Sequence, residues 1–464
     1  MKIGMYVGAL FAGGIAIGVG QFSANAVPGE GGAAEELIAP DVIVGAIPDV
    51  SKWGANTVSG TVIMAYSFGS TSCNIGTQQL DWYSGTNRHP VIPQNAYRVK
   101  NGRFEQIGLS YMKHGFCALQ QSLCGTCQPA GGGCPSLLGI GCSDPYSASL
   151  NGSQSDLGPR YEVNASTGAF PATGSTTWPA IPSGQSTIGR RVQIKQADLD
   201  PAQNTGAVYF AECQYVHPQD AVANNDNNNA SYRTFTVGAL SGGAYTLTLT
   251  GGTNQQKPAI YGWKDVVPAV LITAVDAADG RFMAGYNVTN NGNGTWHYEY
   301  AIHNLNSDSS GKSFSIPVPA GVTITNAGFR DVQYQPGEPY DGTDWTITVA
   351  NGAITWACTQ TFAQNPNANA LRWATCYNFW FDASTAPTPG TATIGYFKTA
   401  GSVNFTGNVP SAAPIVGDLN GDGHVDGADL GVLLAGWGNP GASDLNGDGT
   451  TDGADLGVLL ANWG

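Results

Sequence analysis

Alternating hydrophobic and polar residues dominate the second half of the chain. Residues 282–288 and 296–302 each place an aromatic or aliphatic side chain at every second position, and an Asn-Asn-Gly-Asn-Gly run separates them. The same alternation recurs over residues 345–356, where Asn351-Gly352 interrupts it. Period-two patterns divided by such turns are typical of antiparallel hairpins. We therefore predict a β-sandwich domain over residues 244–400.

The first half is also β-rich, but its pattern is less regular. Strands are predicted over 57–68, 189–195, 207–216 and 231–237. Residues 104–121 are predicted to be a helix, because Ile107, Tyr111 and Ala118 would share one helical face, although Gly108 and Gly115 weaken it. These elements indicate a second antiparallel β-sandwich-like domain, residues 39–240, which contains most of the cysteines.

A helical period appears near the C-terminus, after an expected linker over residues 401–417. Leucine and tryptophan recur there at i, i+3, i+4 and i+7, first as Leu430, Leu433, Leu434 and Trp437 and then as Leu456, Leu459, Leu460 and Trp463. Each stripe follows an Asp/Asn/Gly loop, and the two copies agree at 18 of 21 positions. We predict a small α module, residues 418–464, whose two loop–helix units bury their stripes against each other. A disordered acidic tail is the alternative, but it would not preserve a helical phase twice.

Both loops carry oxygen ligands at the spacing that a hard cation needs. Side-chain oxygens occupy loop positions 1, 3, 5, 9 and 12, a backbone carbonyl occupies position 7, and Gly423 and Gly449 allow a sharp turn at position 6. This spacing predicts Ca²⁺ as the cofactor. The expected ligands are Asp418, Asn420, Asp422, His424, Asp426 and Asp429 in the first loop and Asp444, Asn446, Asp448, Thr450, Asp452 and Asp455 in the second, with His424 and Thr450 acting through their carbonyls.

This duplication resembles the dockerin module, whose two repeats carry Asp at position 12 where EF-hand loops carry Glu. The resemblance covers about a tenth of the chain. In that family, the module plugs a secreted protein, usually one acting on polysaccharide, into a cohesin on a scaffold or cell surface. It therefore implies a cohesin-like protein module as partner and polysaccharide as a further partner. The partner-reading positions 10 and 11 map onto Gly427, Ala428, Gly453 and Ala454.

The first residues of the chain predict export. Lys2 precedes an apolar stretch rich in Gly and Ala, and Ala24-Asn25-Ala26 has the form of a cleavage site, so residues 1–26 are expected to be a signal peptide. The alternative is a transmembrane anchor, but the stretch is short and ends in a processing signal. We expect a secreted or cell-surface protein without membrane insertion after cleavage.

Composition and charge exclude two classes of partner. Charged residues make up 11% of the chain, the net charge is −14, and the tail after Ser411 contributes eight Asp and no Lys, Arg or Glu. No basic patch is present that could bind nucleic acid or an anionic membrane by releasing counterions.

Nine cysteines in an exported chain indicate disulfides. Five lie between Cys117 and Cys142 in a Gly/Pro-rich stretch that needs cross-links for shape, and we also pair Cys358 with Cys376. The alternative for Cys124, Cys127, Cys134 and Cys142 is a tetrahedral zinc site, which an oxidising compartment disfavours.

No catalytic motif is recognisable in the body of the protein. The polar residues least expected in so neutral a chain are Lys113, His114, Asp144, Arg160, Glu212, His217 and Asp220. Glu212 with Asp144 could form the paired carboxylates of a glycosidase, whereas Arg160 could instead fix a loop through carbonyl hydrogen bonds and Asp144 could form a turn before Pro145.

Two functional hypotheses therefore stay open. In the first, a non-catalytic β-rich body is docked onto a partner by its C-terminal module. In the second, the body is a polysaccharide-degrading enzyme, a glycoside hydrolase or lyase, that carries the same module. The tryptophans of the second domain, Trp296, Trp345, Trp356, Trp373 and Trp380, are expected in its core rather than on a sugar-binding face.

Overall fold

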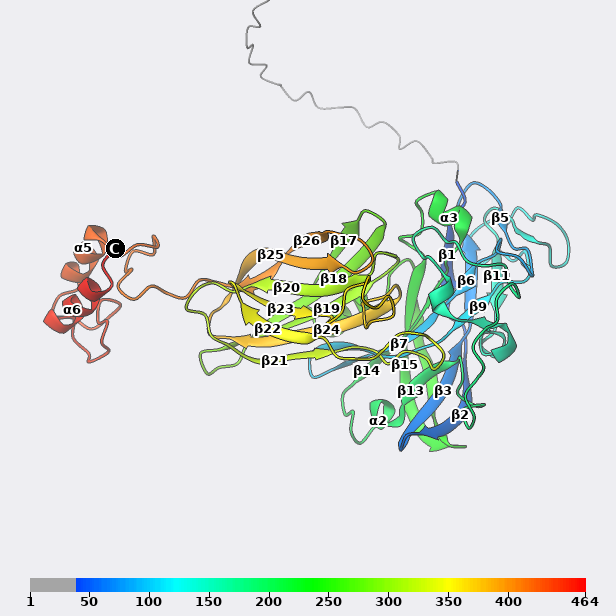
Figure 1. Ribbon diagram of the computed structural model, residues 1–464, viewed down its shortest axis with the longest axis horizontal. Helices are drawn as coiled ribbons and strands as arrows, with labels where there is room; N and C mark the ends of the chain where they lie inside the picture. The colour runs from blue at the N-terminus through cyan, green and yellow to red at the C-terminus, as the bar shows by residue number, and fades with distance from the viewer. Residues whose placement is uncertain (1–38) are drawn as a thin grey trace, which may run out of the picture. The chain divides into compact units, whose positions relative to one another are not determined.

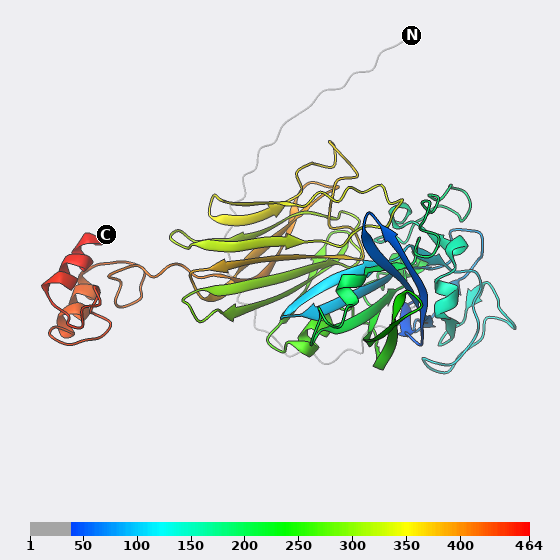
Figure 2. The same cartoon turned by 90° about the horizontal axis from the view of Figure 1, so that it is seen from below.

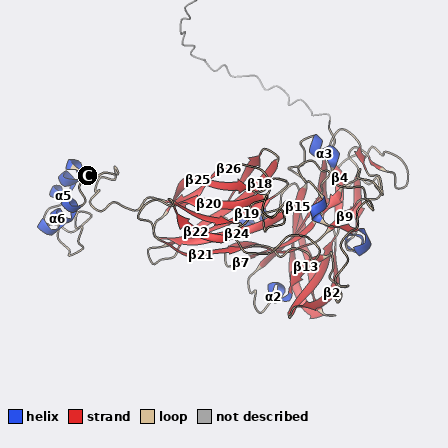
Figure 3. Ribbon diagram, viewed as in Figure 1, coloured by secondary structure: helices blue, strands red, loops and turns tan. Residues whose placement is uncertain are grey.

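The computed structural model describes residues 39–464, so the expected signal peptide at 1–26 lies outside the described residues. The described chain is mainly β, and every named sheet is antiparallel (Figures 1 and 3). Within it, no helix is both long enough and apolar enough to cross a membrane.

The first half of the described chain is built on an eight-stranded sheet. Its strands, in spatial order, are β16 (Ala244–Asn254), β15 (Ala230–Ser241), β14 (Val208–Gln214), β7 (Gln94–Lys100), β8 (Arg103–Leu109), β13 (Val192–Lys195), β3 (Thr61–Phe68) and β2 (Val50–Val58). Apolar residues of one face, among them Tyr66, Ile194 and Phe235, pack into a core with Val42 and Val44.

Three small sheets and several short helices complete this half. The sheets are β1 (Val42–Ala46), β4 (Ser70–Asn74) and β11 (Ser143–Tyr146); β10 (Leu137–Leu138) and β5 (Leu80–Asp81); and β12 (Leu157–Gly158), β9 (Met112–His114) and β6 (Val91–Ile92). The helices are α1 (Ala148–Asn151), α2 (Gln196–Leu199), α3 (Pro218–Val222) and the 3₁₀ turns Gln154–Asp156 and Arg160–Glu162.

Two five-stranded sheets form the second half, and Figure 2 shows their strands running alongside one another. One sheet contains β17 (Leu271–Ala277), β18 (Gly280–Asn290), β19 (Trp296–Asn304), β24 (Thr375–Ala383) and β21 (Ile324–Arg330); the other contains β22 (Thr346–Ala350), β23 (Ala353–Ala357), β20 (Gly311–Pro317), β25 (Pro387–Tyr396) and β26 (Ser402–Pro410). Aromatic side chains of both sheets, including Tyr300, Phe314 and Phe379, share one buried core. The predicted hairpins over 282–302 and 345–356 are confirmed as β18–β19 and β22–β23.

A further apolar cluster joins the two halves. Phe104 and Phe210 of the eight-stranded sheet pack with Trp263 of α4 (Tyr261–Val266) and with Met283 and Cys376 of the second half. The eight-stranded sheet is therefore buried on both faces at β8, because Ile107 contributes to the first core and Phe104 to this cluster.

Burial on both faces explains why the predicted helix over 104–121 is wrong. Residues 103–109 form β8 and residues 112–114 form β9. When both faces of a strand are buried, apolar residues no longer alternate with polar ones along the sequence. Phe104 and Ile107, three residues apart, then have the spacing of a helical i, i+3 pair. Gly108 confirms the strand packing, since a Cβ there would lie 2.5 Å from the backbone oxygen of Gln193.

Three boundaries also differ from the sequence analysis. Residues 57–68 are a hairpin rather than one strand, since Ser59 and Gly60 both adopt positive φ between β2 and β3. Residues 244–254, assigned above to the second domain, form β16 and pair with β15 in the first sheet. Residues 402–410 of the expected linker form β26 and pair with β25.

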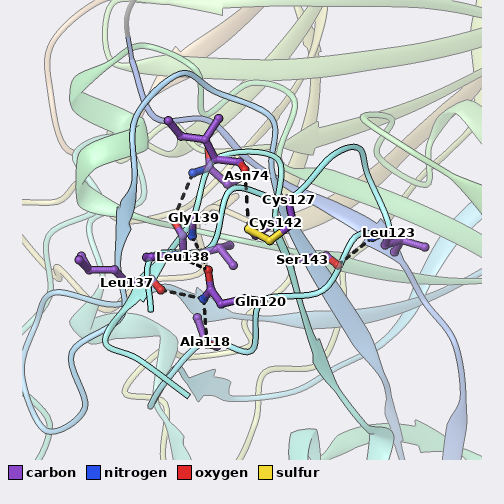
Figure 4. Close-up of a disulfide and its surroundings, with 12 residues drawn as sticks. Asn74, Ala118, Gln120, Leu123, Cys127, Leu137, Leu138, Gly139, Cys142 and Ser143 are labelled. Carbon is purple, nitrogen blue, oxygen red and sulfur yellow. Dashed lines mark hydrogen bonds between the residues drawn. A yellow bond between two sulfur atoms is a disulfide. The ribbon is translucent and has the colours of Figure 1, made fainter. Parts of the chain in front are cut away.

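Disulfides cross-link the Gly/Pro-rich stretch, as predicted. The pairs are Cys73–Cys124, Cys117–Cys134 and Cys127–Cys142. Beside Cys127–Cys142, Gln120 donates to the carbonyls of Ala118 and Leu137 and accepts from Gly139 N (Figure 4). Because Cys124, Cys127, Cys134 and Cys142 are all oxidised, the zinc alternative is wrong.

The predicted Cys358–Cys376 pair is also wrong, since both thiols are free. Cys376 lies on β24, where it faces the cluster that joins the halves. Cys358 follows β23, a strand of the other five-stranded sheet, and packs beside Ala368, Ala370 and Phe397. The two strands that seemed adjacent in sequence belong to different sheets.

This pairing predicts a thiol count. Titration of the denatured, unreduced protein should find three thiols per chain, from Cys213, Cys358 and Cys376. After reduction the count should rise to nine. Nine reactive thiols before reduction would contradict the disulfide assignment.

Candidate metal loops and a polar pocket

The two C-terminal loops repeat one hydrogen-bonding pattern. In the first, the Asp418 carboxylate accepts from the backbone N–H groups of residues 421–423 at 2.7, 3.1 and 2.9 Å. In the second, the Asp444 carboxylate accepts from residues 447–449 at 2.9, 3.1 and 2.7 Å. Gly423 and Gly449 both have a φ near +90°, a conformation that glycine adopts without strain.

Each loop ends in a capped helix, α5 (Gly427–Ala435) or α6 (Gly453–Ala461). Asp426 accepts from Ala428 N at 2.8 Å, and Asp429 accepts in return from Asp426 N at 2.9 Å. Asp452 and Asp455 form the same capping box in the second unit. Asp429 and Asp455 are fully buried, and backbone N–H groups, first that of the N-cap residue, hold the pKa of each carboxyl below its usual value. Both carboxylates therefore stay ionised.

The oxygen geometry of the first loop fits a calcium ion. Asp418, Asp422 and Asp429 each place a carboxylate oxygen within 4.8 Å of the other two. Ligands around one Ca²⁺ lie about 2.3–2.6 Å from it, so two of them can be at most about 5 Å apart. Among residues 39–464 this is the one such group of three. The corresponding carboxylate oxygens of the second loop therefore lie farther apart. All expected side-chain ligands are oxygens, the donors that hard cations prefer.

The predicted burial of the two helical stripes is wrong in part. Leu433 and Leu459 are buried with Val425, and Leu430 and Leu456 pack beside them. The other four members stay exposed: Leu434 at 53%, Trp437 at 45%, Leu460 at 53% and Trp463 at 46%. Helices of nine residues with two glycines each offer too little surface to cover a complete stripe.

Two of the candidate catalytic residues have structural partners. His217 caps α3, accepting from Gln219 N at 3.1 Å, while its Nε2 lies 2.8 Å from the Asp81 carbonyl oxygen. Burial lowers the pKa of His217 to about 4. Asp220 accepts from Val42 N at 2.8 Å and from Asn229 at 2.6 Å, and burial raises its pKa to about 8.

The two carboxylates that could form a glycosidase pair have different hydrogen-bonding partners. Glu212 accepts from Asn95 and Tyr97 at 2.8 and 2.9 Å. Asp144 accepts instead from Leu119 N at 2.8 Å, and no hydrogen-bonding partner within residues 39–464 is common to both carboxylates.

Arg160 links the two halves through hydrogen bonds. Its guanidinium is buried and donates to the carbonyls of Ser110, Gln94 and Ala374 and to the side chain of Asn95, at 2.6, 2.8, 3.2 and 2.9 Å. Ala374 precedes β24 of the second half, whereas the other three partners lie in the first. The loop-fixing alternative of the sequence analysis is therefore confirmed.

Lys113 and His114, in contrast, line a pocket. The pocket has a volume of about 400 Å³ and draws its walls from four separate segments, 84–85, 113–116, 155–156 and 173–178. Lys113 is 2% exposed and its ammonium lies 3.0 Å from Asp156. Sequence analysis missed Phe116, Asp156 and Trp178, because no local motif connects segments this far apart along the chain.

A pair of neutral histidines lies behind this pocket. His89 Nδ1 lies 2.9 Å from the Tyr83 carbonyl oxygen, which can only accept, so Nδ1 carries the proton. His89 Nε2 must then accept from His114 Nδ1 at 3.0 Å. Burial is the main cause that lowers the pKa of both, that of His114 to about 3. His114 Nε2 keeps its lone pair and packs against Gly158, where a Cβ would lie 2.5 Å away.

The tryptophans of the second half are largely core residues. Trp345, Trp356 and Trp373 are buried, while Trp296 and Trp380 are half-buried. The guanidinium of Arg103 covers Trp380 at 3.6 Å, and Arg103 also pairs with Glu299. Three of these five tryptophans are therefore core residues, and Arg103 covers the ring of Trp380.

Comparisons with known proteins assign no family. No family model matches the chain, and no curated protein does. One solved structure that is similar in part is a biofilm associated protein, BSP domain, at 11% identity and a TM-score of 0.15, with coverage of 93% of this chain and 68% of that chain. A similarity of this size carries no information about fold or function.

Proposed function

We propose that this chain is an exported protein whose C-terminal module binds two Ca²⁺ ions and docks the β-rich body onto a cohesin-like module of a scaffold or cell surface. The observation that carries this proposal is the duplicated loop, in which aspartates at equivalent positions accept the same backbone hydrogen bonds. Calcium would supply charge neutralisation: it would be held by the carboxylates of both loops and would fix the helix that follows each one.

Exposed residues on the module support a role in binding a protein. Leu434, Trp437, Leu460 and Trp463 are about half exposed and occupy equivalent positions in the two repeats. Large apolar side chains that stay exposed at matched positions favour an interface, and tryptophan is enriched at the centre of interfaces. The residues at positions 10 and 11, Gly427, Ala428, Gly453 and Ala454, are also exposed.

The proposal places the module in a polysaccharide context, as the dockerin resemblance implies. The non-catalytic version of the body is favoured because Glu212, His217 and Arg160 make structural hydrogen bonds, and one oxygen of Asp144 accepts from Leu119 N.

Capture on immobilised cohesin-type modules tests the docking function. The full chain should bind at least one member of a panel in calcium and be released by excess chelator. Trp437→Ala with Trp463→Ala should weaken binding at least tenfold, since interface tryptophans contribute about 2 kcal/mol or more. Val222→Ser is the matched control, because Val222 is 85% exposed and lies outside the module. Capture that persists in chelator, or capture by no member of the panel, would contradict the proposal.

A further inference from the structure

The pocket beside β9 has a mixed polar and apolar lining, is neutral overall and is partly aromatic. Its volume of about 400 Å³ lies at the small end of the range for ligand sites, about 300–1,000 Å³. Four hydroxyl side chains, Ser84, Ser155, Thr173 and Thr176, contribute to its walls. Lys113 and Asp156 are its charged residues and balance each other.

The Lys113–Asp156 pair can both donate to and accept from a ligand. An ammonium has three donors, and within residues 39–464 Asp156 is the one hydrogen-bonding partner of Lys113 Nζ. The Lys113 side chain is 2% exposed, so bulk water makes few hydrogen bonds to its ammonium. The remaining donors therefore favour an acceptor inside the pocket. Asp156 has a side chain that is 49% exposed and can accept hydroxyl donors on its open side.

Two aromatic side chains line the same pocket, and neighbouring groups hold both in place. Trp178 donates from Nε1 to Glu162 at 3.0 Å and stacks on His114, with ring centroids 5.1 Å apart. Phe116 packs edge-on against Tyr146 at 5.3 Å and is 39% exposed. Side chains fixed in this way lose little entropy when a ligand binds.

The chemistry of the pocket selects among ligand classes. An apolar ligand would leave the remaining donors of the Lys113 ammonium without an acceptor, and an anionic ligand would be repelled by Asp156. A cation would be repelled by the Lys113 ammonium in the pocket wall. A sugar ring has an apolar C–H face and an edge of hydroxyls that donate and accept, which matches both the aromatic and the polar walls.

We propose that this pocket binds one neutral pyranose unit of a glycan. The ring C–H face would lie against Phe116 or Trp178, and neighbouring hydroxyls would accept from Lys113 and donate to Asp156. This site is independent of the calcium loops, so either proposal can fail without the other.

Titration of the full chain with neutral oligosaccharides tests the site. The probes are hexasaccharides of β-1,4-linked glucose, xylose and mannose and of α-1,4-linked glucose, with free glucose, xylose and mannose to separate a chain unit from a free sugar. An oligogalacturonate serves as the charged comparison. Binding is followed by calorimetry and by Trp fluorescence, in calcium and in chelator.

We expect at least one neutral oligosaccharide to bind with or without calcium. Phe116→Ala should weaken that binding about tenfold through lost ring contact, and Asp156→Asn should weaken it about tenfold or more by weakening charge-assisted hydrogen bonds. Phe362→Ala is the matched control, because Phe362 is 38% exposed and lies outside the pocket. Circular dichroism checks that each variant is folded.

Three results would overturn the proposal. They are binding of no neutral sugar at millimolar concentration, preference for the oligogalacturonate over every neutral probe, and equal affinity of Phe116→Ala and the parent protein. Binding of free monosaccharides as tightly as of hexasaccharides would assign the site to a free sugar and overturn the glycan part.

Discussion

Arg160→Ala should destabilise the β-rich body by about 3–5 kcal/mol, the cost typical of removing one partner from a buried, charged hydrogen-bonding network. The substitution would leave the carbonyls of Ser110, Gln94 and Ala374 without their donor. It would also remove the positive charge that faces the buried Glu212 and the half-buried Glu338. Burial lowers the pKa of Arg160 to about 10, so the guanidinium is charged at neutral pH and its removal is felt in full.

Urea or thermal unfolding, followed by near-ultraviolet circular dichroism, measures this effect. Arg160→Lys is the informative comparison. It keeps the positive charge, but an ammonium cannot reproduce the four hydrogen bonds that the planar guanidinium donates. We therefore expect its stability to lie between those of Arg160→Ala and the parent protein. Arg191→Ala removes an arginine that is only half-buried and should cost less. Equal unfolding midpoints for Arg160→Ala and the parent protein would show that this network does not hold the two halves together.

Asp418→Ala combined with Asp444→Ala should abolish the calcium-dependent ordering of residues 418–464. Each of these aspartates accepts three backbone N–H groups in its loop and offers a position-1 ligand. Without them, the remaining six aspartates of the tail keep their mutual repulsion, because few oxygens are left to hold a cation. The variant should gain no helix on calcium addition and should be cleaved readily by protease within the tail.

The unfolding transition of the body should not change in this double variant. Asp344→Ala is the control on the body, since Asp344 is exposed and its loss also removes an aspartate charge. A double variant that gains helix and protease resistance with calcium like the parent protein would place the cation elsewhere.

The sequence pattern predicted the strands that bury only one face. The β18–β19 and β22–β23 hairpins were visible because their alternation is clean and Asn351-Gly352 has the positive φ angles of a hairpin turn. β8 was not recognised, because its two buried faces remove the alternation. Ser59-Gly60 was also missed as a turn, since apolar residues continue on both sides of it.

The two candidate sites also differ in how far the sequence could predict them. The calcium loops are local, with every expected ligand of a loop inside 12 consecutive residues, so spacing alone could predict them. The pocket is not local: Phe116, Asp156 and Trp178 come from segments that only the folded chain brings together. Cys358 and Cys376 show the same limit, because closeness in sequence did not predict which sheet each would join.

Calorimetric titration of the metal-free full chain with Ca²⁺ tests the central claim most directly. We predict two calcium ions per chain, a gain of helix in parallel with binding, and loss of the whole signal in the Asp418→Ala, Asp444→Ala double variant. Absence of calcium binding by the parent chain, or unchanged stoichiometry in the double variant, would contradict the account.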